Sequence, residues 1–512
     1  MPFGAAGIRA KRPDPRQDNR ATSRNFGKDG FHPERNAQLN RAAEQVFFGD
    51  VDSRTCGPVV YRTPTNTRYH LPQPFFFAST YHRLLPLPTP STLKMAQRIT
   101  QLASHLDPRS WSGKGLHAHM AKNDSDVVIV AAGRTPFTKA YKGSMKDSKF
   151  DLLCYEFFKS LIASSAVDPA LIQDIVVGNV HNDEAPYYVR AAALAAGIPN
   201  TTPAIVVNRF CSSGLMAIRA IANGIQAGEI ECGLACGIEH MSTQPKRPTV
   251  ISEELSKLSQ EADDCKMPMG WTSENVAKDF NISRAKMDEY AARSQQRAVQ
   301  AQSQGKFDAE IFPISVPTVG KDGAKQTTVV SADEGPRAGT TAESLGKIKP
   351  AFPQWAPSNT TGGNASQITD GAAGVILMRR SLANKLGLKV LGKYVSCAVT
   401  GLEPRIMGIG PSSAIPAVLA QTGVKQEEVD LFEINEAFAS MYVYCVEKLG
   451  LDPEKVNVNG GACALGHPLG ATGARLVVTA LKELERRQQK VAVVSMCIGL
   501  GMGAAGLILR ED

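Results

Sequence analysis

The sequence lacks any long apolar run, and no stretch approaches the roughly eighteen consecutive apolar residues that a membrane-spanning helix needs. We therefore expect no membrane span. Charged residues make up 21% of the chain and hydrophobic residues 43%. These proportions are typical of a soluble globular protein.

Paired metal-binding cysteines are also lacking, since the ten cysteines show no Cys-x-x-Cys spacing. Cys232, Cys236 and His240 follow one another at intervals of four, in an apolar run that is typical of a strand. Four strand residues span roughly 13 Å, which is too far for two ligands of one metal ion. We therefore expect no metal site, and we interpret the cysteines as free thiols in a reducing compartment.

The excess positive charge, +8 in total, is confined to the start of the chain. Residues 1–94 contain 14 Lys and Arg against 7 Asp and Glu, whereas the rest contains 43 against 42. A nearly neutral folded region provides no electrostatic surface for a nucleic acid, so we expect no nucleic-acid partner.

Residues 1–94 are rich in Pro, Arg, Asn and Gln and show no sustained helical or strand period. We interpret them as a disordered extension or an artefact of the assigned start, with Met95 as an alternative start. A mitochondrial transit peptide is the other interpretation. The seven acidic residues count against it, because such peptides avoid acidic side chains.

A targeting segment and linker are expected at residues 95–123. Directly after Met95 come Arg98-Ile99, five residues, and His105-Leu106. On a helix Ile99, Leu102 and Leu106 share one face. The pattern resembles the N-terminal peroxisomal targeting signal, which an import receptor reads as an amphipathic helix. It predicts a peroxisomal location, with the mitochondrion as the alternative.

The folded region begins near Asp126 with a strand-like run, and strand and helix patterns alternate to about Gly237. Apolar runs without polar alternation indicate strands that are covered on both faces, and therefore a layered α/β core. Residues 241–368 are more polar and irregular, as expected of an insertion. The run Gly371–Arg379 recurs as Gly503–Arg510, which indicates a duplicated domain.

The first segment with chemical potential is Val206–Ile218, where an apolar strand turns through a polar step into Ser-Ser-Gly and a helix pattern. Cys211 is thereby placed near a helix N-terminus. The positive end of the helix dipole stabilises a thiolate, so we expect a lowered thiol pKa at Cys211. On this segment alone, a small buried core residue is the competing interpretation.

Three further segments carry polar groups among glycines or at strand ends. Val458–Arg475 surrounds His467 with glycines, which allow a backbone to approach a ligand closely. His467 is a candidate base. Val493–Gly503 takes Cys497 into a glycine-rich turn whose amides can bind an oxyanion. In Phe432–Phe438 an apolar strand ends at Asn435. For the last two, an ordinary strand-to-loop junction remains the alternative.

In chain order these segments resemble the thiolase family: the nucleophile segment, the Asn-Glu-Ala-Phe motif, the Gly-His-Pro motif and the C-terminal Cys-x-Gly motif. The resemblance covers about residues 124–512. It implies a duplicated five-layer α-β-α-β-α core with an inserted loop domain. The implied domains are an N-terminal half at 124–240 completed by 369–383, a CoA-binding loop domain at 241–368, and a C-terminal half at 384–512.

The resemblance also implies roles. Cys211 is the expected acylated nucleophile and His467 its activating base and an oxyanion donor. Asn435 is expected to hold the water that completes that oxyanion hole, and Cys497 to be the second acid/base. The amides of Cys211 and Gly499 are the expected second oxyanion hole. Leu500 departs from the family, many of whose members have glycine there.

The expected substrate contacts lie mainly in the insertion. Matches to the family place CoA against Arg337, Ser344 and Ser366, and the pantetheine or acyl group against Met269 and Phe352. For the last two, ordinary core packing is an equal alternative. No cofactor is implied, because CoA is a substrate. The family implies at least a homodimer.

The activity that the resemblance implies is thiolysis of 3-ketoacyl-CoA in fatty acid β-oxidation. One alternative is a biosynthetic acetoacetyl-CoA thiolase that runs the condensation. An alternative of another class is a non-catalytic lipid-binding member of the superfamily.

The targeting segment can be tested with two fluorescent fusions, one that begins at Met1 and one that begins at Met95. Imaging of each should show peroxisomal signal that is lost in the Arg98→Ala/His105→Ala variant, because the receptor reads one helical face. Gln101→Ala and Ser104→Ala are the matched controls. Mitochondrial signal, or peroxisomal signal that survives the double substitution, would contradict the assignment.

Overall fold

The computed structural model describes residues 115–243, 251–319, 325–355 and 357–511. The predicted extension at 1–94 and the predicted targeting segment at 98–106 lie outside the described residues. The first described element is the short helix α3 (Leu116–Met120), which packs against the C-terminal half through Leu116 and Met120.

The N-terminal half is a sheet in the order β1-β8-β5-β3-β4, with the short β2 paired to β8. Its strands are mostly fully buried, as the unbroken apolar runs predicted. The elements are β1 (Val127–Arg134), β2 (Thr138–Lys139), α4 (Phe150–Ser164), β3 (Asp174–Gly178), α5 (Ala185–Ala195), β4 (Ala204–Val207), α6 (Ser213–Ala227), β5 (Cys232–His240), β8 (Thr369–Arg379) and α12 (Arg380–Lys385).

The C-terminal half repeats this order as β9-β12-β11-β10, and Phe432 of β10 pairs further with Val456 by a parallel bridge. The repeated runs are β8 and β12, which occupy equivalent places in the two halves. The elements are β9 (Gly392–Gly401), α13 (Gly410–Thr422), β10 (Leu431–Ile434), α14 (Ala439–Lys448), α15 (Ala462–Leu465), α16 (Leu469–Arg487), β11 (Val491–Ile498) and β12 (Met502–Arg510).

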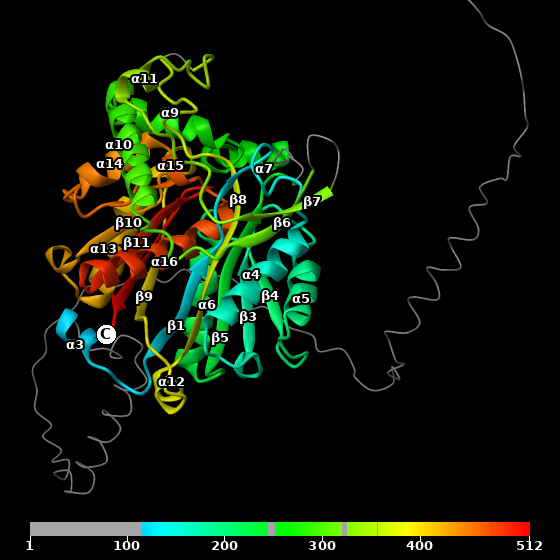
Figure 1. Ribbon diagram of the computed structural model, residues 1–512. Helices are drawn as coiled ribbons and strands as arrows, with labels where there is room; N and C mark the ends of the chain where they lie inside the picture. The colour runs from blue at the N-terminus through cyan, green and yellow to red at the C-terminus, as the bar shows by residue number, and fades with distance from the viewer. Residues whose placement is uncertain (1–114, 244–250, 320–324, 356, 512) are drawn as a thin grey trace, which may run out of the picture. The chain divides into compact units, whose positions relative to one another are not determined.

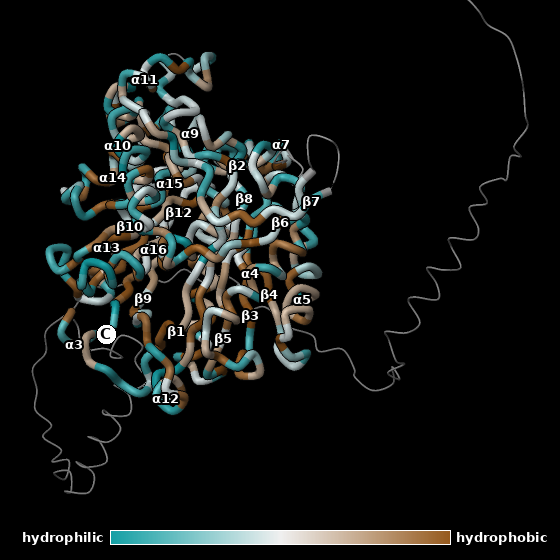
Figure 2. The backbone as a smooth tube through the Cα atoms, in the orientation of Figure 1, coloured by the Kyte–Doolittle hydropathy of each residue, from teal (hydrophilic) through white to brown (hydrophobic). Residues whose placement is uncertain are grey.

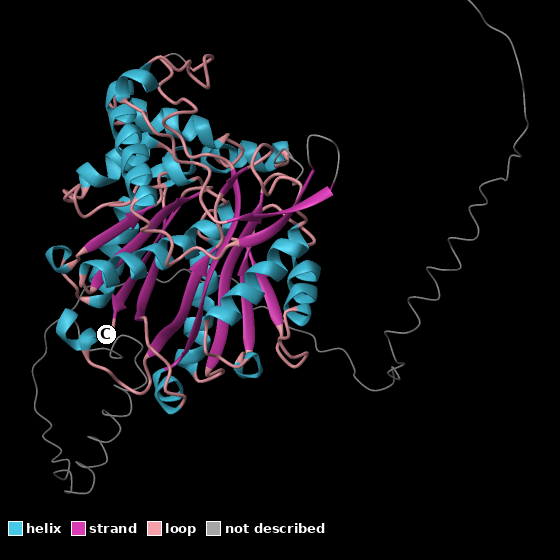
Figure 3. Cartoon of the chain, viewed as in Figure 1, coloured by secondary structure: helices cyan, strands magenta, loops and turns pink. Residues whose placement is uncertain are grey.

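The two halves join where β1 and β9 pair antiparallel, so that one sheet runs through both. Three apolar cores separate the layers. One lies between α4, α5 and the N-terminal strands, a second encloses α6 and α16 between the two halves, and a third lies between the C-terminal strands and α13 and α14. Figures 1 and 3 show these helices on both sides of the strands, and Figure 2 shows the apolar residues concentrated there. The five-layer core is confirmed.

The two central helices cross at their first turns, where glycines bring backbone against backbone. A Cβ placed on Gly214 of α6 would lie 2.6 Å from the carbonyl oxygen of Gly470 in α16. A Cβ on Gly237 of β5 would lie 1.9 Å from that same oxygen. Only glycine permits this approach of backbone to backbone. Gly214 follows Cys211, and Gly470 follows His467, by three residues each, so the crossing brings the two segments together.

Between β5 and β8 the chain forms a helical region, most of whose helices stand at the top of Figure 1 and whose strand hairpin lies lower, on the right. It contains α7 (Glu253–Leu258), α8 (Gln260–Asp264), α9 (Met269–Asp279), α10 (Arg284–Ser303), the hairpin β6 (Ile314–Val319) and β7 (Lys325–Val330), and α11 (Ala342–Gly346). The buried Arg134 at the end of β1 ties it to the core. Its guanidinium binds Glu310 at 2.7 Å and both carboxylate oxygens of Asp333 at 2.7 and 2.8 Å.

Cys232, Cys236 and His240 all lie on β5, so the predicted strand is confirmed. Within the described ranges, no group of three or more His, Cys, Asp or Glu side chains is arranged to hold a metal ion. Nor does any helix in the described part of the chain combine the length and the apolar character required to cross a bilayer.

The helix crossing predicts that Gly237→Ala destabilises the protein by about 1–3 kcal/mol or more, because its Cβ would meet a backbone oxygen that cannot move aside. Gly346→Ala in α11 is the matched control, since nothing lies within 4 Å of its added Cβ. Denaturant unfolding of both variants measures the difference. Equal midpoints for the two variants would contradict the proposed close approach.

Candidate active site

Cys211 lies one residue before the N-cap of α6, as predicted, and is 8% exposed. Gly499 lies against its neighbour Phe210, with 3.6 Å between a Cβ placed on Gly499 and the Phe210 ring, and the backbone amides of Gly499 and Cys211 both act to lower the thiol pKa. Gly499 follows β11, in the opposite half of the molecule. The thiol therefore sits where the N-terminus of α6 meets the turn between β11 and β12.

The predicted lowering of the Cys211 pKa is wrong. Burial raises the pKa of this thiol to about 11, although the amides of Gly499 and Cys211 act to lower it. Desolvation of the thiolate costs more free energy than the two amides and the helix N-terminus supply in stabilisation. Cys211 is therefore a thiol at neutral pH, and a base must remove its proton as it reacts.

The residues beside the two amide donors have an unusual backbone. Phe210, which precedes Cys211, has φ of 46°, and Leu500, which follows Gly499, has φ of 68°. Non-glycine residues rarely adopt this left-handed region, and such strain persists only where the surroundings impose it. Leu500 keeps its amide, as expected, but it adopts a conformation that glycine would adopt more readily.

His467 is 5% exposed, and both of its ring nitrogens have partners. Nδ1 lies 2.6 Å from the hydroxyl of Thr472, and Nε2 lies 3.3 Å from Nδ2 of Asn435. The Thr472 hydroxyl donates its one proton to the carbonyl of Pro468 at 3.0 Å, so Nδ1 of His467 must donate to Thr472. Nε2 then carries the lone pair and faces the Asn435 side.

Burial, together with the charge of Arg475, lowers the pKa of His467 to about 3. The imidazole is therefore neutral at neutral pH. A neutral imidazole whose Nε2 lone pair meets only the 3.3 Å contact with Nδ2 of Asn435 can accept the proton of a thiol, and Nε2 becomes a hydrogen-bond donor when it does so.

Asn435 comes directly after β10, and its position is fixed by a buried network. Its backbone N–H donates to the carbonyl of Ser495 on β11 at 2.9 Å. The next residue, Glu436, accepts from Ser294 at 2.6 Å and from Asn457 at 2.9 Å. Among the described residues, Oδ1 of Asn435 has no hydrogen-bond partner although it is buried. An unpaired buried acceptor is costly, so this atom is suited to a substrate or solvent donor.

Cys497 is fully buried near the end of β11, and packs with Met407, Ala437 and Met441. Burial raises the pKa of its thiol well above the usual range, and a charge on Cys211 raises it further. The two thiols are therefore close enough to interact electrostatically. A second thiol that resists ionisation beside the first is suited to hold a proton and donate it.

The structure thus brings the predicted catalytic residues to one place through two sets of contacts. Gly499 and Cys497 approach Cys211, whereas Asn435 approaches His467. Within the described residues, no hydrogen bond joins the Cys211 thiol to His467. The two sets meet through the Gly214–Gly470 crossing described above.

The predicted substrate-binding residues lie in two places, some near the thiol and some farther from it. A Cβ on Gly499 would lie 3.6 Å from the sulfur of Met269, so Met269 borders the turn beside the thiol, and Phe352 packs over the neighbouring Gly270. The Ser366 amide donates to the carbonyl of Ala437 at 3.0 Å, beside Asn435.

The other two predicted CoA contacts lie farther along the helical region. The side chains of Arg337 and Ser344 are exposed. The Arg337 amide donates to Gln295 of α10, and the Ser344 hydroxyl is engaged in the capping box of α11 with Thr341. Within the described part of the chain, no hydrogen bond or ion pair joins either side chain to Cys211.

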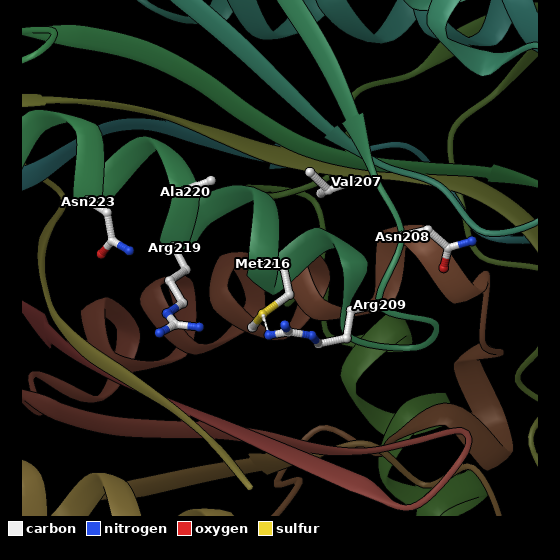
Figure 4. A pocket seen from close by; sticks show the side chains of 7 residues that line it. All are labelled: Val207, Asn208, Arg209, Met216, Arg219, Ala220 and Asn223. Carbon is white, nitrogen blue, oxygen red and sulfur yellow. Dashed lines mark hydrogen bonds between the residues drawn. The ribbon is translucent and has the colours of Figure 1, made fainter. Parts of the chain in front are cut away.

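A cavity of about 250 Å³ lies between the end of β4 and α6, lined by Val207, Asn208, Arg209, Met216, Arg219, Ala220 and Asn223 (Figure 4). None of the predicted catalytic residues lines it. It belongs to the surface beside the nucleophile segment and not to the site itself.

Sequence reasoning missed two residues that hold the site. Thr472 orients the His467 ring. Glu239, near the end of the apolar strand β5, accepts four hydrogen bonds, one from Gly470 and three from residues 179–181. A lone acidic residue at the end of a fully apolar strand was the available signal for Glu239. Thr472 gave no signal, since threonine is ordinary in a helix.

Comparison with known proteins agrees with this geometry. Residues 127–381 match the family described as the thiolase N-terminal domain, and residues 388–510 match the thiolase C-terminal domain. The chain is 49% identical to 3-ketoacyl-CoA thiolase A, peroxisomal, of Candida tropicalis over 81% of this chain and 100% of that protein.

Two solved structures are similar over most of the chain. The dimeric peroxisomal thiolase of Saccharomyces cerevisiae matches with a TM-score of 0.72 and 49% identity, over 77% of this chain and 100% of that one. The human mitochondrial 3-ketoacyl-CoA thiolase in complex with CoA matches with a TM-score of 0.67 and 37% identity, over 75% and 98%.

The raised pKa of Cys211 predicts how the thiol reacts with iodoacetamide. The rate of alkylation should rise about tenfold per pH unit through the neutral range, without a plateau, because only the thiolate reacts and its fraction grows until the pKa near 11 is reached. Mass spectrometry of the labelled Cys211 peptide across pH measures this. A plateau below pH 8 would instead indicate a thiolate–imidazolium pair.

Proposed function

The chain belongs to the thiolase family, and from that premise we propose that it cleaves 3-ketoacyl-CoA with CoA through an acyl group carried on Cys211. The products are acetyl-CoA and an acyl-CoA shortened by two carbons. It is an acetyl-CoA C-acyltransferase of fatty acid β-oxidation.

In the first half-reaction, Nε2 of His467 takes the Cys211 proton and the sulfur attacks the 3-keto carbon. The amides of Cys211 and Gly499 receive the oxyanion. The carbon–carbon bond then breaks, and the electron pair leaves on acetyl-CoA as an enolate. The protonated His467 and a donor held by Asn435 stabilise the enolate oxygen, and Cys497 gives its proton to the carbanion carbon.

In the second half-reaction, the Cys497 thiolate removes the proton of an incoming CoA thiol. The CoA sulfur attacks the acyl-cysteine carbonyl, and the same two amides hold the tetrahedral oxyanion. Collapse releases the shortened acyl-CoA and returns the proton from His467 to Cys211. Both steps are balanced without any further cofactor, so CoA acts only as a substrate.

One observation carries the proposal: the turn at Gly499, from the opposite half of the molecule, packs against Phe210 beside Cys211, and its amide acts with that of Cys211 to lower the thiol pKa. Amides this close to the sulfur lie within reach of an oxygen on the carbon that the sulfur attacks. Loss of one such donor typically costs about 100- to 1000-fold in rate. A non-catalytic lipid-binding protein has no need of this arrangement beside a second thiol and a neutral histidine.

The protein acts in peroxisomes. The peroxisomal relative from Candida tropicalis is 49% identical, whereas the human mitochondrial enzyme is 37% identical. The dimeric yeast structure supports a homodimer. Import through a receptor that reads the segment after Met95 is part of the proposal.

A biosynthetic acetoacetyl-CoA thiolase is the second candidate, because the same residues can run the condensation. The names of the similar peroxisomal enzymes favour cleavage. Thiolysis rates on acetoacetyl-CoA and on longer 3-ketoacyl-CoA substrates discriminate the two. Activity restricted to acetoacetyl-CoA would favour the biosynthetic enzyme.

Cys211→Ser should reduce thiolysis at least 1000-fold and abolish the acyl-enzyme, because a serine hydroxyl is far harder to ionise than a thiol. Intact-protein mass spectrometry after mixing with 3-ketoacyl-CoA detects the adduct. Cys232→Ser, at a buried cysteine of β5, is the matched control and should retain both the thiolysis rate and the acyl-enzyme. Near-normal turnover in Cys211→Ser would overturn the assignment.

A further inference from the structure

We propose that Glu239 is a positioning residue for this reaction, whose carboxylate ties the helix turn behind His467 to the loop after β3 and carries its charge close to Cys211. The inference rests on the proposed thiolase reaction and adds a residue to it. Glu239 is the penultimate residue of β5, and its side chain is fully buried.

Four N–H groups donate to the Glu239 carboxylate. Oε2 accepts from Gly470 at 2.8 Å and from Val180 at 3.0 Å. Oε1 accepts from the His181 amide and from the side chain of Asn179, both at 3.2 Å. All four partners are N–H donors, so a proton on either carboxyl oxygen would point at another hydrogen. The geometry therefore selects the ionised form.

These bonds hold the segment that carries His467. Gly470 lies in the first turn of α16, three residues after His467. A Cβ on Gly470 would lie 2.6 Å from the carbonyl oxygen of Gly178 and 2.9 Å from Oε2 of Glu239. The turn is thus held between the end of β3 and the Glu239 carboxylate, and a shift of this carboxylate would shift the base. Misplacement of a catalytic group by about 1 Å can cost roughly 100-fold in rate.

The charge of Glu239 lies close to the nucleophile segment, because Gly470, whose amide Glu239 binds, packs against Gly214, three residues after Cys211. It raises the pKa of Cys211 beyond the effect of burial. Among the described residues, Asp370 on β8 is the other titratable side chain that acts on Glu239, and its charge raises the pKa of Glu239. Burial raises the pKa of Glu239 to about 7, opposed by its three backbone donors. The four donors favour the anion, and above about pH 7 its charge disfavours a resting thiolate at Cys211.

Glu239→Gln removes the charge and turns one hydrogen-bond acceptor into a donor that opposes an amide. We expect kcat to fall on the order of 10- to 100-fold with KM changed little, since the loss is one of positioning. The pH profile of Cys211 alkylation by iodoacetamide should move to lower pH, because the thiolate no longer faces an anion.

Glu239→Asp separates the two effects, because it keeps the charge but shortens the reach. It should lower kcat while the alkylation profile stays close to that of the unaltered protein. Should the Gln variant not fold, a fall in kcat with this retained profile in the Asp variant still supports the proposal. Native kcat in either folded variant, or an unmoved alkylation profile in Glu239→Gln, would overturn it. A variant with a lower melting temperature but with native kcat and a native alkylation profile would also overturn the proposal, because Glu239 would then be only structural.

Glu334→Gln is the matched control. Its carboxylate also accepts backbone amides, those of Lys139 and Ser144, but in a different loop. It should change neither kcat nor the alkylation profile. The alkylation measurement needs no acyl substrate, so an absence of thiolysis in the unaltered protein would refute the proposed function without deciding the role of Glu239.

Discussion

The close crossing of α6 and α16 brings the segment of Cys211 against the segment of His467. Gly214, Gly237 and Gly470 bring backbone against backbone at the start of the two helices. Cys211 and His467, the proposed nucleophile and base, each lie two residues before the first residue of their helix. The duplicated fold thus places one group from each half at a shared point, which neither half could assemble alone.

Around this crossing, burial sets the chemistry. It holds Cys211 as a thiol and His467 as a neutral base, so the resting site contains no charge pair between them. Proton transfer and attack on the substrate are then coupled, since the thiolate forms only as the acyl carbon becomes available. Fixed amide donors do not have to reorganise when the oxyanion appears, which is the main advantage of a preorganised site.

The local parts of this arrangement could be predicted from the sequence. Apolar runs located β1 and β5, the Ser-Ser-Gly step located the start of α6, and the resemblance to thiolases predicted roles for Cys211 and Asn435. The sign of the Cys211 pKa shift could not be predicted, because it depends on how much water the whole fold excludes. Glu239 could not be assigned a role either. Its donors come from residues 179–181 and from Gly470, and only the folded chain brings these together.

The strand order has a consequence for synthesis. β1 pairs with β8 and β9 alone among the described strands, and β8 also fills the place between β1 and β5. A nascent chain therefore carries β1 unpaired until the ribosome has delivered Thr369–Arg379, long after β3, β4 and β5 have emerged. Unpaired apolar strand edges are prone to aggregation, and non-local pairing is slow. During that interval the growing chain should be a client for chaperones, which its finished fold no longer needs.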